Sequence, residues 1–81
     1  MAEVSNKTQV VISPHLSKYC VFVKGTKNNQ NDTLTVSELS SIDVAILICS
    51  NALETYSVSG NVITLTSANT GTVAGIVIGD K

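Results

Sequence analysis

The chain has 81 residues, of which 43% are hydrophobic and only 14% are charged. We expect a single domain over residues 1–81, because a typical domain needs about 100 residues. The net charge of −1 and the 4% of aromatic residues disfavour nucleic-acid binding, which requires a basic surface or rings on which bases stack.

The N-terminal residues are not expected to form a targeting signal. They lack the basic stretch and apolar run of a secretory signal peptide, and no segment approaches the roughly 20 apolar residues of a membrane span. We therefore expect a chain that is made and kept in a cytosol, without a signal peptide and without a membrane partner.

Seven strands are predicted along the chain. Val, Ile and Thr dominate, and Ser, Asn and Gly recur at short intervals, which is typical of an all-β domain. Pro14 has no amide donor, so it ends the first strand or places it at a sheet edge. Residues 37–41 allow at most one short helical turn, which Ser37 can cap. The expected strands are residues 8–13, 18–24, 33–36, 42–50, 54–59, 61–67 and 72–79.

The turns between these strands are marked by glycine and asparagine. Residues 51–53 are predicted as a turn, and Gly60 with Asn61 is predicted as the tip of a type II′ hairpin. Gly75, inside the last strand, indicates a bulge or the close approach of another backbone. The predicted fold is a small antiparallel β-sandwich or a partly closed barrel.

Three of the predicted strands are apolar on both faces. Residues 42–49 begin with alternation and become apolar at every position, and residues 18–24 and 72–78 also carry apolar side chains on both faces. A chain of this length is too short to cover both faces of a sheet, so we expect other copies or another protein to supply the missing cover. The predicted oligomer interface consists of Ile46, Ile48, Val73, Ile76 and Ile78.

No cluster of residues specifies a reaction. A metal site would require Cys20, Cys49 and His15 to converge from separate strands. A Cys-His nucleophile would require His15 to meet an exposed thiolate of Cys20 or Cys49, but both cysteines lie in apolar runs. We expect them as free core thiols, with a disulfide as the less favoured alternative. The six acidic residues are separated in sequence and are expected at the solvated surface. Asp43 is the exception, because on a central strand it would cap the preceding turn or mark a polar point in a subunit contact.

These considerations predict no catalytic residue, no metal ligand and no cofactor. The chain is therefore not expected to be an enzyme. The polar stretches at residues 25–32 and 51–54 are the loops that could recognise a ligand from a rigid β scaffold.

The second half of the chain resembles small structural proteins of tailed bacteriophages, of the head or decoration type. The resemblance covers residues 39–46, 56–66 and 71–79, where a strand after a short Ser/Leu turn is followed by a Ser-Gly-Asn hairpin and a glycine-bearing terminal strand. It implies a β-sandwich or barrel, a role in a virion or its assembly, self-association often as trimers, and no catalytic residues.

Two functions from different classes are therefore expected. The first is a non-catalytic phage or prophage structural protein that self-associates, attaches to another virion component, and is found in the virion or the host cytoplasm. The alternative is a small binding module that recognises a protein or a glycan through loops 25–32 and 51–54, although the absence of Trp disfavours stacking on sugars.

Overall fold

The protein folds into two antiparallel β-sheets packed face to face. The computed structural model describes residues 2–15 and 18–81, with side chains described for residues 2–12 and 18–81. The all-β, sandwich-like architecture predicted from the sequence is confirmed. The larger sheet has the order β1 (Ser5–His15), β2 (Lys18–Lys27), β8 (Gly71–Asp80), β4 (Ser41–Cys49), β5 (Ala52–Leu53), and the smaller has the order β3 (Thr33–Thr35), β7 (Val62–Leu65), β6 (Tyr56–Ser59).

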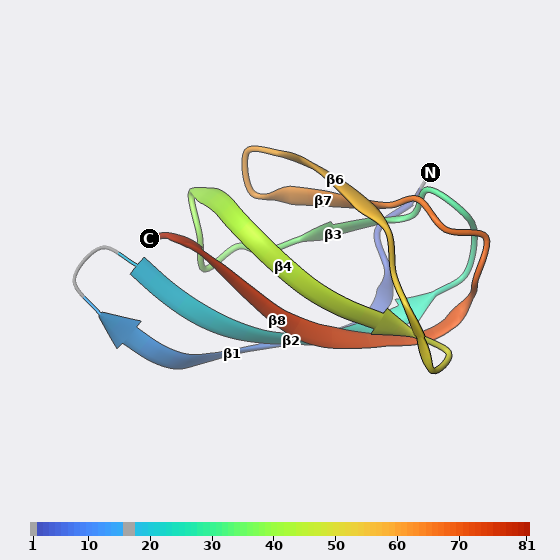
Figure 1. The fold of residues 1–81 in the computed structure, drawn as a ribbon, viewed down its shortest axis with the longest axis horizontal. Coiled ribbons are helices and arrows are strands. Elements are labelled where there is room, and N and C mark those ends of the chain that lie inside the picture. Colours follow the sequence, from blue (N-terminus) through green and yellow to red (C-terminus); the bar gives the residue numbers. More distant parts are fainter. Residues whose placement is uncertain (1, 16–17) are drawn as a thin grey trace.

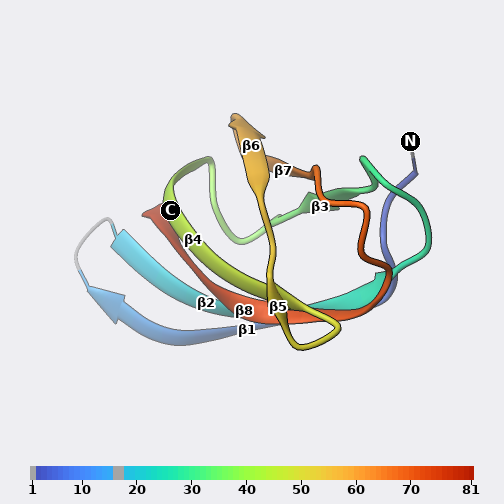
Figure 2. The same cartoon turned by 45° about the vertical axis from the view of Figure 1, so that its right-hand side comes forward.

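The five-stranded sheet curves around the three-stranded sheet. Figure 1 shows long strands β2, β8 and β4 lying side by side beneath the shorter β3, β7 and β6. Turning the view shows that the large sheet is concave toward the small sheet and convex on its other side (Figure 2). The N-terminal segment joins the two layers, because Val4 N donates to the carbonyl of Thr33 (2.9 Å) just before the chain enters β1.

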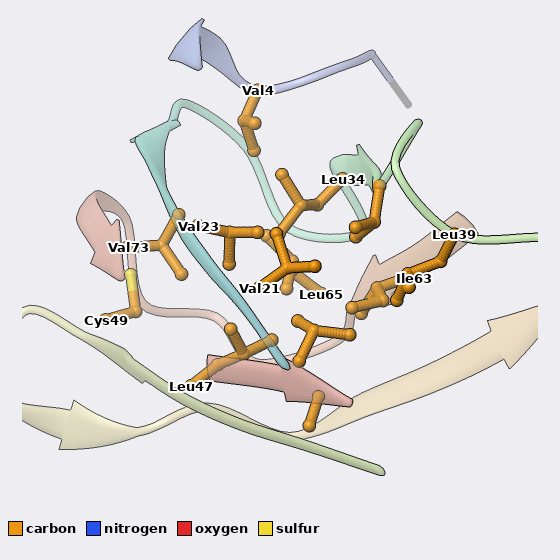
Figure 3. Packing of buried hydrophobic residues seen from close by; sticks show 13 residues of the cluster. Val4, Val21, Val23, Leu34, Leu39, Leu47, Cys49, Ile63, Leu65 and Val73 are labelled. Carbon is orange, nitrogen blue, oxygen red and sulfur yellow. The ribbon is translucent and has the colours of Figure 1, made fainter. Parts of the chain in front are cut away.

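The hydrophobic core fills the space between the two sheets (Figure 3). Alternation along each strand produces it: every second residue of β2, β4 and β8 points inward, where it meets the inward residues of β3 and β7. The core residues are Val4, Val21, Val23, Leu34, Val36, Leu39, Ala45, Leu47, Cys49, Ile63, Leu65, Val73 and Val77.

The predicted hairpin is confirmed at Gly60 and Asn61, which connect β6 to β7 with Ser59 paired to Val62. Gly60 has a φ of 62°, and Asn61 is not among the residues with positive φ, as a type II′ turn requires.

The prediction of a turn at residues 51–53 was shifted by one residue. The chain turns at Ser50 and Asn51, with φ of 53° and 68°, and Ala52 and Leu53 then form the short strand β5. The sequence reasoning missed this strand because a two-residue segment carries no alternation.

The prediction of a close backbone approach at Gly75 is confirmed. A Cβ at Gly75 would collide with the backbone carbonyl of Ile46 on the neighbouring strand β4, and the same is true of Gly79 against Ser41. The register between β4 and β8 shifts between Ile42 and Val44, so the extra residue is Asp43.

Residues 37–40 form a turn, and no helix occurs in the part of the chain that the structure describes. Leu39 N donates to the carbonyl of Val36 (3.0 Å). This hydrogen bond closes a turn that reverses the direction of the chain once, and the Leu39 side chain lies in the core. Accordingly, the described residues include no helix long and apolar enough to cross a membrane.

Candidate interaction surface

The convex side of the five-stranded sheet carries an apolar surface that no other part of the described chain covers. We call this surface the outer face. Because inward and outward residues alternate, each core residue of β2, β4 and β8 is followed by one that points away from the small sheet. The outer face consists of Val10, Ile12, Cys20, Phe22, Val44, Ile46, Ile48, Ile76 and Ile78.

Strand register arranges these residues in rows across the sheet. One row runs through Val10, Phe22, Ile76 and Ile46, which are paired in that order on β1, β2, β8 and β4. Ile46 is 63% exposed and Val10 is 51% exposed, whereas Phe22 between them is half-buried. The row is therefore apolar on every one of the four long strands.

A second apolar row lies beside the first. It runs through Cys20, Ile78 and Val44, with Ile12 next to Cys20 at an irregularity of the β1 register. Ile48 continues the apolar surface on the other side of the first row, where it pairs with exposed Leu53 on β5. The two complete rows and this extension form one contiguous apolar surface.

Four of the five predicted interface residues lie on the outer face, and one does not. Ile46, Ile48, Ile76 and Ile78 all point to solvent. The prediction for Val73 was wrong, because its side chain is only 1% exposed and packs in the core between the sheets. The register explains the error: Val73 pairs with Cys49, which is an inward position of β4.

Sequence reasoning did not include Val10 and Ile12 in the interface. The strand of residues 8–13 reads as a simple edge strand, and only its register with β2 shows that Val10 stands beside Phe22. The apolar second face of residues 18–24 was the available signal, since Phe22 and Cys20 need neighbours on the same face.

One end of the outer face is bounded by an ion-pair cluster. Lys18 Nζ lies 2.5 Å from Asp43 Oδ2 and 2.8 Å from Asp80 Oδ1. The hydrogen bonds that Lys18 donates to Asp43 and to Asp80 raise the pKa of Lys18, and the bond to Asp43 has the larger effect. The hydrogen bond from Lys18 lowers the pKa of Asp80. Asp43 therefore occupies a bulge and an ion pair rather than capping the preceding turn, and its role in a subunit contact stays a prediction.

The β1 edge of the large sheet is poorly suited to pairing with another strand. The register of β1 against β2 shifts twice, between Ser5 and Thr8 and between Val11 and Ser13. Bulges and proline both hinder edge-to-edge pairing, and β1 contains Pro14 in addition to its register shifts. The sheet face, rather than this edge, is therefore the surface open to association.

The opposite edge of the sheet is partly occupied by the chain itself. The strand β5 pairs with the last two residues of β4. Beyond it, Glu54 N donates to the carbonyl of Leu47 (2.8 Å) and Ala45 N donates to the hydroxyl of Tyr56 (3.1 Å). These bonds use main-chain groups of β4 that a strand from another molecule would need.

The two predicted recognition loops meet in a buried ion pair. Lys27 Nζ lies 3.2 Å from Glu54 Oε1, and both side chains are fully buried. Lys27 also donates to the carbonyl of Ser67 (2.6 Å), whose own N–H and hydroxyl donate to Glu54. The interpretation of residues 25–27 as loop was wrong, because β2 continues to Lys27. The prediction that Glu54 lies at the solvated surface was also wrong.

Asp32 is a second buried carboxylate that was predicted to be solvated. It accepts hydrogen bonds from the main-chain N–H groups of Asn28 (2.9 Å), Asn29 (3.0 Å) and Ala2 (3.4 Å). These bonds, led by that from Asn28, lower the pKa of Asp32 although its burial acts in the opposite direction. The carboxylate thus fixes the loop of residues 28–32 instead of facing a ligand.

The cysteines are both free, as predicted, but only one lies in the core. Cys49 is buried, and desolvation raises the pKa of its thiol. Cys20 is half-buried on the outer face, so its prediction as a core thiol was wrong. The side chain of His15 lies outside the described residues, so the expectation that His15 forms neither a metal site nor a Cys-His nucleophile stays a prediction.

Within residues 2–12 and 18–81, no pocket is formed and no three or more His, Cys, Asp and Glu side chains gather where they could hold a metal ion. No protein-family model, curated protein or solved structure matches the chain. The outer face is therefore the feature of the molecule from which a function can be inferred.

Proposed function

We propose that this protein is a non-catalytic structural protein that self-associates through the outer face of its five-stranded sheet and attaches, once assembled, to a component of a phage or prophage virion. The observation that carries the proposal is the pair of apolar rows that cross four strands and lack cover. Water contact with such a surface is unfavourable, so burying it against another protein surface stabilises an assembly.

A second copy is the partner that best explains this surface. The chain has few charges, and those on the convex side lie beyond the two apolar rows, toward the ends of the strands, rather than within the rows. An apolar centre with a polar rim is the composition of protein interfaces. The resemblance of residues 39–79 to phage head and decoration proteins supports a virion as the larger assembly.

The test is the solution mass of the wild type and of Ile46→Asp, measured by light scattering during size exclusion over a tenfold concentration range. We expect the wild type to have a multiple of the 8.5 kDa chain mass and Ile46→Asp to have the mass of one chain. The introduced carboxylate would be solvated in the monomer but desolvated in the assembly.

Val58→Asp is the matched control, because Val58 is also an exposed apolar residue but lies on β6 of the small sheet. Its mass should equal that of the wild type. A wild type that is monomeric at every concentration would overturn self-association and favour the alternative of a loop-based binding module. The mass also tests the trimer that the resemblance implies.

A further inference from the structure

The outer face carries opposite charge at its two ends. At one end, Lys24 points outward on β2 between Thr8 and Ala74, and it forms no ion pair with any described residue. At the other end stands the cluster of Lys18, Asp43 and Asp80, in which two carboxylates and one ammonium leave a net negative charge.

The neighbouring Lys81 does not neutralise this cluster on the outer face. Its Nζ lies 5.7 Å from the centre of the Tyr19 ring. Tyr19 alternates with Cys20 along β2 and packs against the core, so this lysine is drawn toward the inner side of the sheet. One end of the outer face is therefore positive and the other negative.

Two copies can stack by these faces about a two-fold axis in either of two ways that keep their strands aligned. With the axis parallel to the strands, each end of the face meets the same end of the other copy, so Lys24 approaches the second Lys24. With the axis parallel to the rows, the strands run antiparallel across the interface, and each end meets the opposite end.

We infer that a second copy of this chain packs on the outer face in the antiparallel arrangement, with Lys24 of each copy against the Asp80 and Asp43 cluster of the other. This inference rests on the proposed self-association and adds its geometry. Both charge contacts are attractive in this arrangement, whereas both are repulsive in the parallel one. The assembly unit is then a two-fold dimer and not the trimer that the resemblance implies.

The size of the apolar surface explains why the ends matter. Four strands about 4.8 Å apart and two complete apolar rows about 6.8 Å apart give a projected area of roughly 260 Å², which Ile48 and Leu53 extend on one side. A stable interface of standard size buries about 800 Å² on each partner, so the polar ends must contribute. Because the face is convex along the strands, the central rows touch first, and the long Lys24 side chain reaches across where the sheets diverge (Figure 2).

The inference is tested with two charge reversals, Lys24→Glu and Asp80→Lys, measured alone and mixed by light scattering at low ionic strength. Each variant alone brings like charges together twice in its homodimer, so we expect its dissociation constant to rise roughly tenfold. In the mixture, the glutamate introduced at position 24 of one variant meets the reversed cluster of the other, and the unaltered Lys24 meets the unaltered cluster. The mixed pair should therefore associate as tightly as the wild type.

Three outcomes separate this inference from the proposed function. If Lys24→Glu mixed with wild type associates more tightly than wild type alone, Lys24 lies near its own equivalent and the antiparallel arrangement is wrong. If neither reversal changes the dissociation constant while Ile46→Asp abolishes association, the ends do not meet, although the outer face still mediates self-association. A monomeric wild type overturns both ideas.

A second variant at the negative end of the outer face, Asp43→Lys, keeps the test valid if Asp80→Lys does not fold. Asp43 is an exposed bulge residue, whereas Asp80 also accepts a hydrogen bond from Ser41 Oγ (3.1 Å). Mixing Asp43→Lys with Lys24→Glu should restore association in the same way. Failure of both folded negative-end variants to do so contradicts the antiparallel arrangement.

Discussion

The two faces of the five-stranded sheet are similar in composition but opposite in environment. On β4, Leu47 is fully buried against the small sheet, whereas its neighbour Ile46 is 63% exposed. The same contrast holds on β8 between Val77 and Ile78, and on β2 between Val21 and Phe22. An apolar residue in a strand therefore indicates that its face of the sheet must be buried. It does not indicate whether the same chain or another molecule buries that face.

The difference between the faces follows from how much second sheet the chain can build. The strands β3, β7 and β6 supply a single small layer, and it is used entirely on the concave side. Covering the convex side as well would need a further layer of similar size. The inner face thus determines folding, and in our proposal the outer face determines assembly.

The strongest test of this division is a matched pair of substitutions at adjacent positions. Leu47→Asp places an unpaired carboxylate in the core, so we expect a loss of about 5 kcal/mol or more in the free energy of unfolding, which is comparable to the entire stability of a small domain. Ile46→Asp should remain folded. Circular dichroism at a concentration too low for association distinguishes them, and equal loss of structure in both would show that the two faces are not distinct.

The buried ion pair at the end of the inner face should give the next largest effect. Lys27→Met leaves the carboxylate of Glu54 buried without its ammonium partner, which we expect to lower the free energy of unfolding by about 3–5 kcal/mol. Lys7→Met, which breaks the partly exposed pair with Glu3, is the control and should cost about 1 kcal/mol or less. Urea denaturation gives both values. Equal costs would mean that burial adds nothing to the Lys27 pair.

Close packing between β8 and β4 can be tested at Gly75. Gly75→Ala introduces a Cβ against the Ile46 carbonyl, and backbone cannot move aside as a flexible side chain can, so we expect a loss of about 1–3 kcal/mol. Gly60→Ala separates this clash from backbone strain, since its Cβ would meet no atom although φ is 62°. We expect the Gly60 variant to retain more stability in thermal unfolding, and the reverse order would contradict the close approach.

The smallest expected effect is a change in the acid dependence of stability. The pKa of Asp32 is lowered on folding from its ordinary 3.8, so its contribution is present above about pH 4 and is lost as the pH falls through the lower folded value. Asp32→Asn should therefore flatten the curve of unfolding midpoint against pH between about pH 5 and pH 2. An unchanged slope would show that this carboxylate does not stabilise the loop of residues 28–32.

Much of the fold could be predicted from the sequence because its signals are local. Alternation located the long strands, and the pair Gly60-Asn61 located the hairpin, since each depends only on neighbouring residues. The short strand β5 escaped prediction because a two-residue segment carries no alternation. The extension of β2 to Lys27 escaped prediction because it is defined by partners on β8 that are distant in sequence.

The candidate surface was predicted in part for the same reason. Alternation showed that β4 and β8 have two apolar faces, but it did not show which face lies inside. Val73 and Ile76 are three positions apart and therefore point to opposite faces, so the prediction that placed both in one interface failed for Val73.

The buried Glu54 could not be identified, since its partner Lys27 lies on β2, a segment distant in sequence. The main-chain donors of Asp32 at residues 28–29 are local, but Ala2, which also donates to it, belongs to the distant N-terminal segment.

The reactivity of Cys20 tests the role of the outer face most directly. Cys20 lies in the second apolar row, and Cys49 is an internal control whose buried thiol has a raised pKa. We expect a maleimide to label Cys20 more slowly as protein concentration rises, while Cys49 stays unreactive until the protein unfolds. A Cys20 labelling rate that is independent of concentration, over a range in which the solution mass increases, would contradict assembly through this face.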